Sequence, residues 1–122
     1  MIGVTEAERQ VMEVLWAGGP RTPDELVREI APAQGWGEAT VKTLVNRLLK
    51  KGAIASRREG GRTVYEPLLA RDEYVTAESQ GLLDRLFGGE LAPLVAHFAR
   101  RQALSDNERA RLRRLLDELD RE

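Results

Sequence analysis

The stretch that decides the fold is EATVKTLVNRLLKKG, residues 38–52, which leads into IASRREGGRTVYEPL, residues 54–68. In the first part, apolar residues recur at spacings of three and four, which predicts an amphipathic helix over residues 38–51 that Gly52 ends. In the second part the period changes to two. This predicts strands over residues 54–58 and 62–68, joined by a glycine turn. A helix followed directly by a β-hairpin is therefore expected.

The same stretch carries a concentrated positive charge. Residues 42–62 contain seven basic residues and one acidic residue, 7 − 1 = +6, whereas residues 3–41 contain three basic and seven acidic residues, 3 − 7 = −4. The net charge of −1 for all 122 residues conceals this segregation. A local excess of cations of this size predicts a surface that binds phosphates.

Two shorter helices are expected before this stretch. The pattern Thr-x-x-Glu at residues 5–8 and again at 22–25 predicts two capping boxes, each marking a helix start. Gly18-Gly19-Pro20 ends the first helix, and we expect the second to end before Pro32. Three helices and then a hairpin is the order of a winged helix-turn-helix.

The rest of the chain predicts three more helices, over residues 72–87, 91–101 and 105–119. The fold class is therefore mainly α with a small β-hairpin wing: a winged helix-turn-helix domain over residues 1–70 and a C-terminal helical dimerisation arm over residues 71–122. A leucine stripe on the last helix needs a partner, and a second copy of the chain is the expected one. The residues expected at the dimer contact are Leu83, Leu86, Phe87, Leu112, Leu115, Leu116 and Leu119.

The predicted contacts to DNA follow from this fold. In a winged helix the third helix enters the major groove and the hairpin reaches the neighbouring phosphates. Arg and Lys suit guanine, and Asn suits adenine. The helix residues expected to contact DNA are Thr40, Lys42, Thr43, Asn46, Arg47 and Lys50. The wing residues expected to contact phosphates are Arg57, Arg58 and Arg62.

Several classes of function are disfavoured. The sequence has no cysteine and one histidine, so it indicates no metal site, no cofactor and no catalytic constellation, and the protein is not expected to be an enzyme. The longest near-apolar run, residues 91–99, is shorter than a membrane helix needs. We therefore expect no membrane insertion and a cytoplasmic location. Trp16 and Trp36 are expected to pack in the core rather than to stack on bases.

Particular motifs resemble a known family. The run EVLW at residues 13–16, GWGEATVKTLVNRLLKKG at residues 35–52, VYEP at residues 64–67 and LVAHF at residues 94–98 are similar to those of penicillinase repressors of the BlaI/MecI type. The resemblance extends over nearly the whole chain.

This resemblance implies a homodimeric repressor that binds palindromic operators at β-lactamase or related promoters. It also implies a partner, a membrane-embedded sensor metalloprotease, whose signal leads to cleavage in the arm and to release of DNA. The chain differs from the family pattern at two positions: Ala39 stands where a lysine is common, and His97 stands where an asparagine often precedes the cleaved bond. The cleavage candidate is therefore the pair His97 and Phe98.

Two other functions are compatible with the same fold. A ligand-responsive regulator of the MarR or PadR kind would bind a small molecule between domain and arm and would leave DNA without being cut. A winged helix that only binds another protein belongs to a different class, and it would not need the positive charge of residues 42–62.

Overall fold

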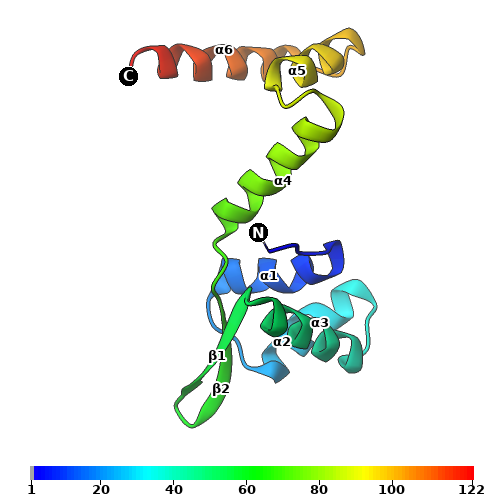
Figure 1. Cartoon of the computed structure of the whole chain (residues 1–122), viewed down its shortest axis with the longest axis vertical. Helices are drawn as coiled ribbons and strands as arrows, with labels where there is room; N and C mark the ends of the chain where they lie inside the picture. Colours follow the sequence, from blue (N-terminus) through cyan, green and yellow to red (C-terminus); the bar gives the residue numbers. More distant parts are fainter. Residues whose placement is uncertain (1) are drawn as a thin grey trace. The chain divides into compact units, whose positions relative to one another are not determined.

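The computed structural model describes residues 2–122 and confirms the predicted fold class (Figure 1). In this part of the chain it has six helices and one antiparallel two-stranded sheet. Two compact units are formed, by residues 1–75 and 76–122. The elements are α1 (Glu6–Gly18), α2 (Pro23–Gln34), α3 (Glu38–Lys51), β1 (Ile54–Glu59), β2 (Arg62–Pro67), α4 (Arg71–Leu86), α5 (Leu91–Arg100) and α6 (Asp106–Asp120).

The core of the first unit lies between α1, α2 and α3. Each helix contributes the apolar residues that its periodicity places on one face, and the start of β1 closes the core. Side chains that are almost completely buried include Met12, Leu15, Leu26, Leu48 and Ile54. Trp16 and Trp36 are partly buried against this core, as predicted.

The second helix is longer than predicted. α2 continues through Pro32 to Gln34 instead of ending before the proline. A proline lacks the N–H that an inner helix position needs, but Pro32 is exposed and lies in the last turn, next to the buried Ile30 and Ala31. The helix ends at Gly35, whose φ of 70° is the left-handed conformation that favours glycine at this position.

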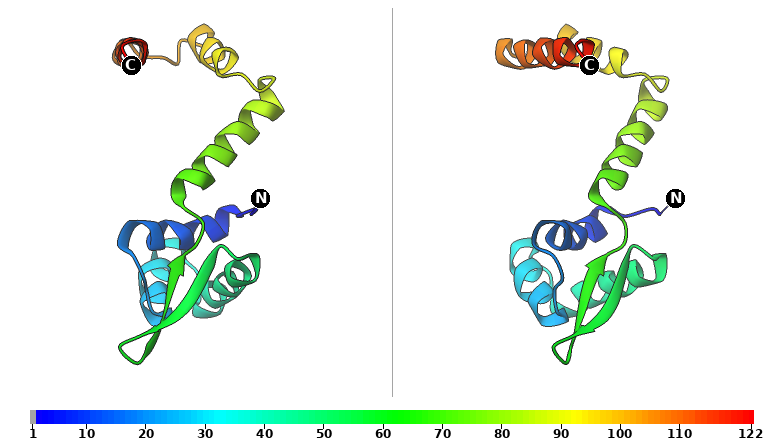
Figure 2. Two further views of the ribbon diagram at one scale, coloured as in Figure 1. Left: turned by 60° about the vertical axis from the view of Figure 1, so that its left-hand side comes forward. Right: turned by 90° about the vertical axis from the view of Figure 1, so that its left-hand side faces the viewer.

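The hairpin pairs in the register Ile54↔Pro67 through Glu59↔Arg62. Gly60 and Gly61 form its turn with φ values of 58° and 79°, which glycine adopts without the strain that a side chain would add. Figure 2 shows the tip of the hairpin extending beyond α2 and α3. We call this β1–β2 hairpin the wing.

An ion pair between a buried carboxylate and a partly exposed lysine joins the start of α1 to the end of α3. Glu8 is fully buried and completes the capping box with Thr5, whose N–H donates to Glu8 Oε1 at 2.8 Å. The ammonium of Lys51 also donates to Glu8 Oε1, and to the carbonyl of Gly3 at 2.8 Å. Burial raises the pKa of Glu8, but the bonds from Lys51 and Thr5 outweigh it, so the pKa lies below its ordinary value.

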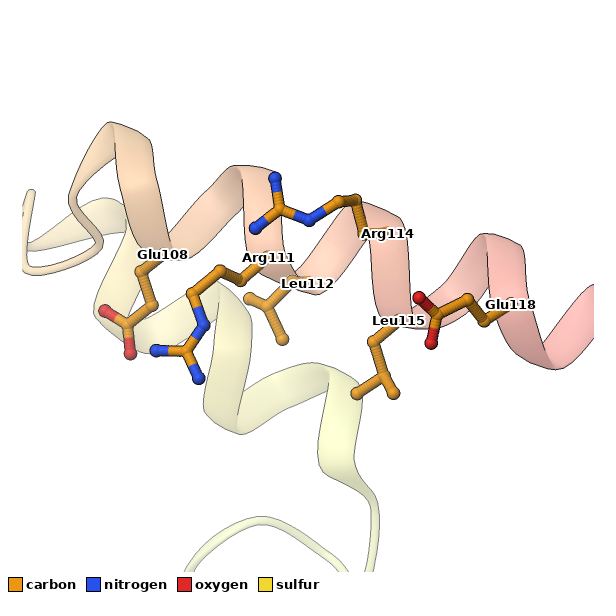
Figure 3. Close-up of a pocket in the computed structure, with 6 residues that line it drawn as sticks. All are labelled: Glu108, Arg111, Leu112, Arg114, Leu115 and Glu118. Carbon is orange, nitrogen blue, oxygen red and sulfur yellow. The ribbon is translucent and has the colours of Figure 1, made fainter.

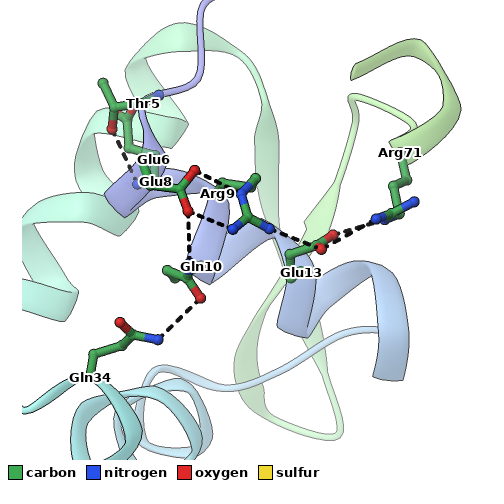
Figure 4. A network of polar contacts seen from close by, with 8 residues as sticks. All are labelled: Thr5, Glu6, Glu8, Arg9, Gln10, Glu13, Gln34 and Arg71. Carbon is green, nitrogen blue, oxygen red and sulfur yellow. Dashed lines mark hydrogen bonds and ion pairs between the residues drawn. The ribbon is translucent and has the colours of Figure 1, made fainter. Parts of the chain in front are cut away.

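The start of α4 is held to α1 within the first unit. Trp16 Nε1–H donates to the carbonyl of Leu69 at 2.8 Å, and its ring lies 5.5 Å from the ring of Tyr74. Figure 4 shows that Glu13 lies between Arg9 and Arg71, with Nε of Arg71 2.9 Å from a Glu13 oxygen. These contacts fix the direction in which the chain leaves the wing.

The second unit buries none of its residues. Residues 76–122 are all described, and each is exposed or half-buried. In Figure 3, Leu112 and Leu115 project from one side of α6, beside the charged Arg111. They line an open groove of about 420 Å³ together with Glu108, Arg114 and Glu118. Leu115, Leu116 and Leu119 are each more than half exposed.

The Glu8–Lys51 pair should make the stability of the domain depend on pH. Glu8→Gln is expected to lower the free energy of unfolding at pH 7 by about 1 to 3 kcal/mol. The ion pair between the buried carboxylate and Lys51 is lost, and the amide NH₂ of the glutamine would stand at the position of Oε2, a buried atom without a hydrogen-bond partner among the described residues. Because the pKa of Glu8 is lower folded than unfolded, its ionised form adds stability above the ordinary value of 4.5, and this contribution disappears as the pH falls toward the folded value.

Urea unfolding of the full chain at several pH values between 7 and 3 measures both effects. The variant should therefore lose less stability on acidification than the wild type. Glu59→Gln, on the exposed wing tip, is the matched control and should behave like the wild type. Identical pH profiles for Glu8→Gln and the wild type would contradict this role for Glu8.

Candidate nucleic-acid interface

The exposed side of α3 is the centre of the candidate site. Val41, Leu44, Val45 and Leu48 are buried in the core and Leu49 packs partly against it, so the positions on the opposite side of the helix point to solvent. All six predicted contact residues are exposed there. We call them the reading face: Thr40, Lys42, Thr43, Asn46, Arg47 and Lys50.

A shallow groove borders one edge of the reading face. It has a volume of about 300 Å³, and α2, α3 and β2 contribute its walls. Lys42 and Asn46 are its reading-face residues, and three valines form its apolar part. The groove therefore combines donors and acceptors at its edge with an apolar interior. Its lining residues are Pro23, Val27, Val41, Lys42, Val45, Asn46 and Tyr65.

Lys42 is paired with an acid on its own helix. Its Nζ lies 2.7 Å from Oε1 of Glu38, one turn earlier, with both side chains more than half exposed. The hydrogen bond and charge of Glu38 raise the pKa of Lys42, and the same contact lowers the pKa of Glu38. The sequence analysis did not select Glu38. Its i, i+4 spacing from Lys42, with the acid nearer the N-terminus, was the signal available.

The three wing arginines have different surroundings. Arg57 pairs with Glu66 at 2.9 Å and with Glu59 at 3.3 Å, and the Glu66 carboxylate raises its pKa. Arg58 donates to Thr63 Oγ1 at 3.0 Å and to the carbonyl of Gly61, so these contacts give it no carboxylate partner. Arg62 is exposed beside the turn. The wing is therefore basic, but the charge of Arg57 is partly compensated.

A backbone bridge fixes the wing to the helical core. The N–H of Arg21 donates to the carbonyl of Tyr65 at 3.1 Å, and the N–H of Tyr65 donates back at 2.8 Å. Arg21, two residues before α2, therefore forms an antiparallel bridge to β2. This contact could not be predicted from the sequence, because a single bridging residue has no periodic pattern.

Other kinds of site receive no support from the geometry. Within residues 2–122, no group of three or more His, Asp or Glu side chains is arranged to hold a metal ion. No helix in the described part of the chain has the length and hydropathy that a membrane span requires.

Three packed helices, an exposed polar face on the third and a basic hairpin beside it define a winged helix-turn-helix domain of the DNA-binding class. The sequence also matches the profile of the penicillinase repressor family over residues 4–118. The chain therefore belongs to the penicillinase repressor family, a family of DNA-binding transcriptional repressors.

Individual relatives agree with this assignment. The chain is 31% identical to the penicillinase repressor of Bacillus licheniformis over 115 residues, which cover 94% of this chain and 90% of the relative. It is 26% identical to the methicillin resistance regulatory protein MecI of Staphylococcus aureus strain N315, with 93% of each chain covered.

Solved structures agree in the DNA-binding unit. The solution structure of the DNA-binding domain of the repressor BlaI matches 60% of this chain and 89% of that domain, with a TM-score of 0.54 and 32% identity. The monomeric form of Bacillus licheniformis BlaI, solved in complex with the blaP half-operator, matches 61% of this chain and 92% of that one, with a TM-score of 0.56 and 32% identity. A MarR family protein from Bacillus stearothermophilus matches at a TM-score of 0.52 with 18% identity, a likeness of fold alone.

Proposed function

We propose that this chain is a homodimeric repressor that binds palindromic operators and controls β-lactamase or related resistance genes. The observation that carries the proposal is the reading face, an exposed set of cations, an amide and hydroxyls on a helix whose opposite side is buried. The Bacillus licheniformis relative bound to a half-operator supports it, since half of an operator is what one subunit of a dimer would occupy.

Within this proposal, α3 lies in the major groove. Lys42 and Arg47 donate to guanine O6 and N7, and Asn46 exchanges hydrogen bonds with adenine. Thr40, near the positive end of the helix, contacts a phosphate, whereas Thr43 contacts a thymine methyl or a phosphate. Lys50, in the last turn, adds a phosphate contact.

The wing provides affinity rather than sequence preference. Arg57, Arg58 and Arg62 lie on the hairpin and neutralise phosphates beside the groove. Arg58 and Arg62 contribute most, because Arg57 already pairs with two carboxylates. The Arg21–Tyr65 bridge keeps the hairpin at a fixed place on the domain.

Arg47→Ala is expected to weaken binding to the cognate operator by about 1 to 3 kcal/mol and to relax the preference at one base position. The reason is that a base contact, unlike a phosphate contact, discriminates between sequences. Electrophoretic mobility shifts on cognate and random DNA at several salt concentrations measure the change.

Arg58→Ala is the comparison variant. It should weaken binding to both kinds of DNA alike and reduce the salt dependence by about one unit of slope. Equal losses on cognate and random DNA for Arg47→Ala would rule out its contact with a base.

The second unit is proposed to form the dimer. Its helices leave Leu86, Leu115, Leu116 and Leu119 more than half exposed, and a partner subunit would remove this apolar surface from water. On α6, residues 106–114 hold four arginines and two acids, 4 − 2 = +2, whereas residues 115–120 hold three acids and no basic residue, 0 − 3 = −3. Antiparallel pairing of two α6 helices brings the basic half of each beside the acidic half of the other. The proposed dimer residues are Leu83, Leu86, Phe87, Leu112, Leu115, Leu116 and Leu119.

A chain that ends at Val75 tests this arm. The truncated chain keeps the complete core, which lies within residues 4–64, and it is expected to be monomeric. It should bind a palindromic operator about 10²-fold more weakly than the full chain. In a dimer, binding of one domain places the second domain at a high effective concentration near the other half-site, about 34 Å away. Analytical ultracentrifugation and binding to whole and half operators measure both effects. A truncated chain that still sediments as a dimer would place the interface in the first unit.

Release is proposed to follow cleavage in α5. A membrane sensor metalloprotease would trigger cutting at or near His97 and Phe98, which detaches α6 from the DNA-binding domain. Loss of part of the dimer contact lowers operator occupancy without any change in the DNA contacts. Phe98 is 44% exposed in the single chain, so a bond at this place is accessible unless a second subunit covers it. The proposed location of the whole protein is the cytoplasm.

Cells that contain the paired sensor should accumulate cut repressor after exposure to a β-lactam. Mass spectrometry of the tagged protein is expected to find a fragment that ends at or next to His97, and uninduced cells provide the control. Derepression while the full-length chain stays intact would contradict the proteolytic mechanism and would favour a release by ligand.

A further inference from the structure

The first turn of α3 holds an acidic side chain that the proposed function does not use. Glu38 is the first residue of the helix, and Ala39 and Thr40 after it are both short. Glu38 is thus the long polar side chain of this turn, and 60% of its side chain is exposed. The N-terminal residues of a recognition helix are the ones that contact base edges. A carboxylate there lies close to any DNA that the reading face binds.

Glu38 lies in one row with two residues of the reading face. Steps of four residues along α3 lead from Glu38 to Lys42 and then to Asn46, and positions four apart are neighbours on a helix surface. The 2.7 Å contact between Glu38 and Lys42 holds the first two members of the row together. Lys42 and Asn46 both border the groove between α2, α3 and β2. Along the helix, the row therefore presents a hydrogen-bond acceptor on Glu38, a donor on Lys42 and an amide on Asn46.

The carboxylate and the ammonium of this row suit a cytosine and a neighbouring guanine, respectively. A carboxylate has about four lone-pair positions, and the ammonium of Lys42 engages one of its oxygens. The amino group N4 of cytosine is the donor in the major groove that Glu accepts, whereas Lys donates to guanine. A phosphate, by contrast, repels the carboxylate and competes with it for Lys42. Glu38 therefore favours sites that offer a cytosine amino group and disfavours contact with the backbone alone.

We propose that Glu38 is a specificity-determining residue, which accepts a hydrogen bond from a cytosine N4 next to the guanine that Lys42 contacts. This inference rests on the proposed function, since it needs α3 in the major groove. The paired Lys42 keeps the carboxylate from being an isolated negative charge beside the phosphates. In sequences without that cytosine, the acid weakens binding, so it sharpens the difference between operator and other DNA.

Selection of binding sites from random DNA by the full-length chain tests the role of Glu38. The wild type is expected to enrich cytosine at one position of each half-site. In Glu38→Gln the preference for cytosine at that position should fall about tenfold, while the base preferences at the other positions stay unchanged. The variant should also bind random DNA more tightly. On random DNA, where no guanine is in place for Lys42, the salt dependence of the variant should steepen by about one unit of slope, because Lys42 is then free to contact a phosphate. Glu38→Ala, which also removes the carboxylate, should give the same loss.

Two further variants separate this role from simpler ones. Glu6→Gln removes the exposed Glu6–Arg9 pair on α1 and changes the net charge equally, so it should leave the selected sequence unchanged. Lys42→Gln should lose the guanine preference but keep the cytosine. If the Lys42 and Glu38 variants both lose the base preference at the same position of the site, Glu38 does not contact a base directly. A selected sequence that is unchanged in Glu38→Gln would also overturn the proposal. A wild type that enriches no sequence would instead contradict the proposed function.

Discussion

Burial of the apolar side of α3 is the constraint on which the rest of the structure depends. Val41, Leu44, Val45 and Leu48 can leave water only by packing against α1 and α2, and each is at most 5% exposed. Because a helix is rigid, fixing one side of α3 fixes the direction of every residue on the other side. The reading face is thus a consequence of core packing. Its residues need no contacts of their own to be held in place.

Contacts outside the helical core determine where the neighbouring elements lie. The Lys51–Glu8 pair ties the end of α3 to the start of α1, and the Arg21–Tyr65 bridge ties the wing to the start of α2. Trp16 on α1 donates a hydrogen bond to the carbonyl of Leu69 and so holds the segment that follows the wing. Three polar contacts, each between segments far apart in the sequence, therefore set the geometry around the apolar core.

Carboxylates compensate part of the positive charge of the candidate interface. Lys42 and Arg57 each pair with a carboxylate, whereas Arg58 pairs with a hydroxyl and a carbonyl. Paired cations lose part of their attraction for phosphates in general but retain donors for a base that offers an acceptor. We therefore expect a domain of this kind to bind random DNA less strongly than its count of basic residues suggests. On this proposal, the arrangement favours recognition of a sequence over attraction to any nucleic acid.

Local patterns in the sequence determined the element order, the helix starts and the outward side of α3. The capping boxes at Thr5 and Thr22 and the period of residues 38–51 were sufficient, because capping and amphipathicity act between residues at most a few positions apart. The end of α2 was misjudged, since burial of Ile30 and Ala31 and the cap at Gly35 outweighed the cost of Pro32. The partners Glu8–Lys51 and Arg21–Tyr65 lie 43 and 44 residues apart in the sequence, and only tertiary packing brings such pairs together.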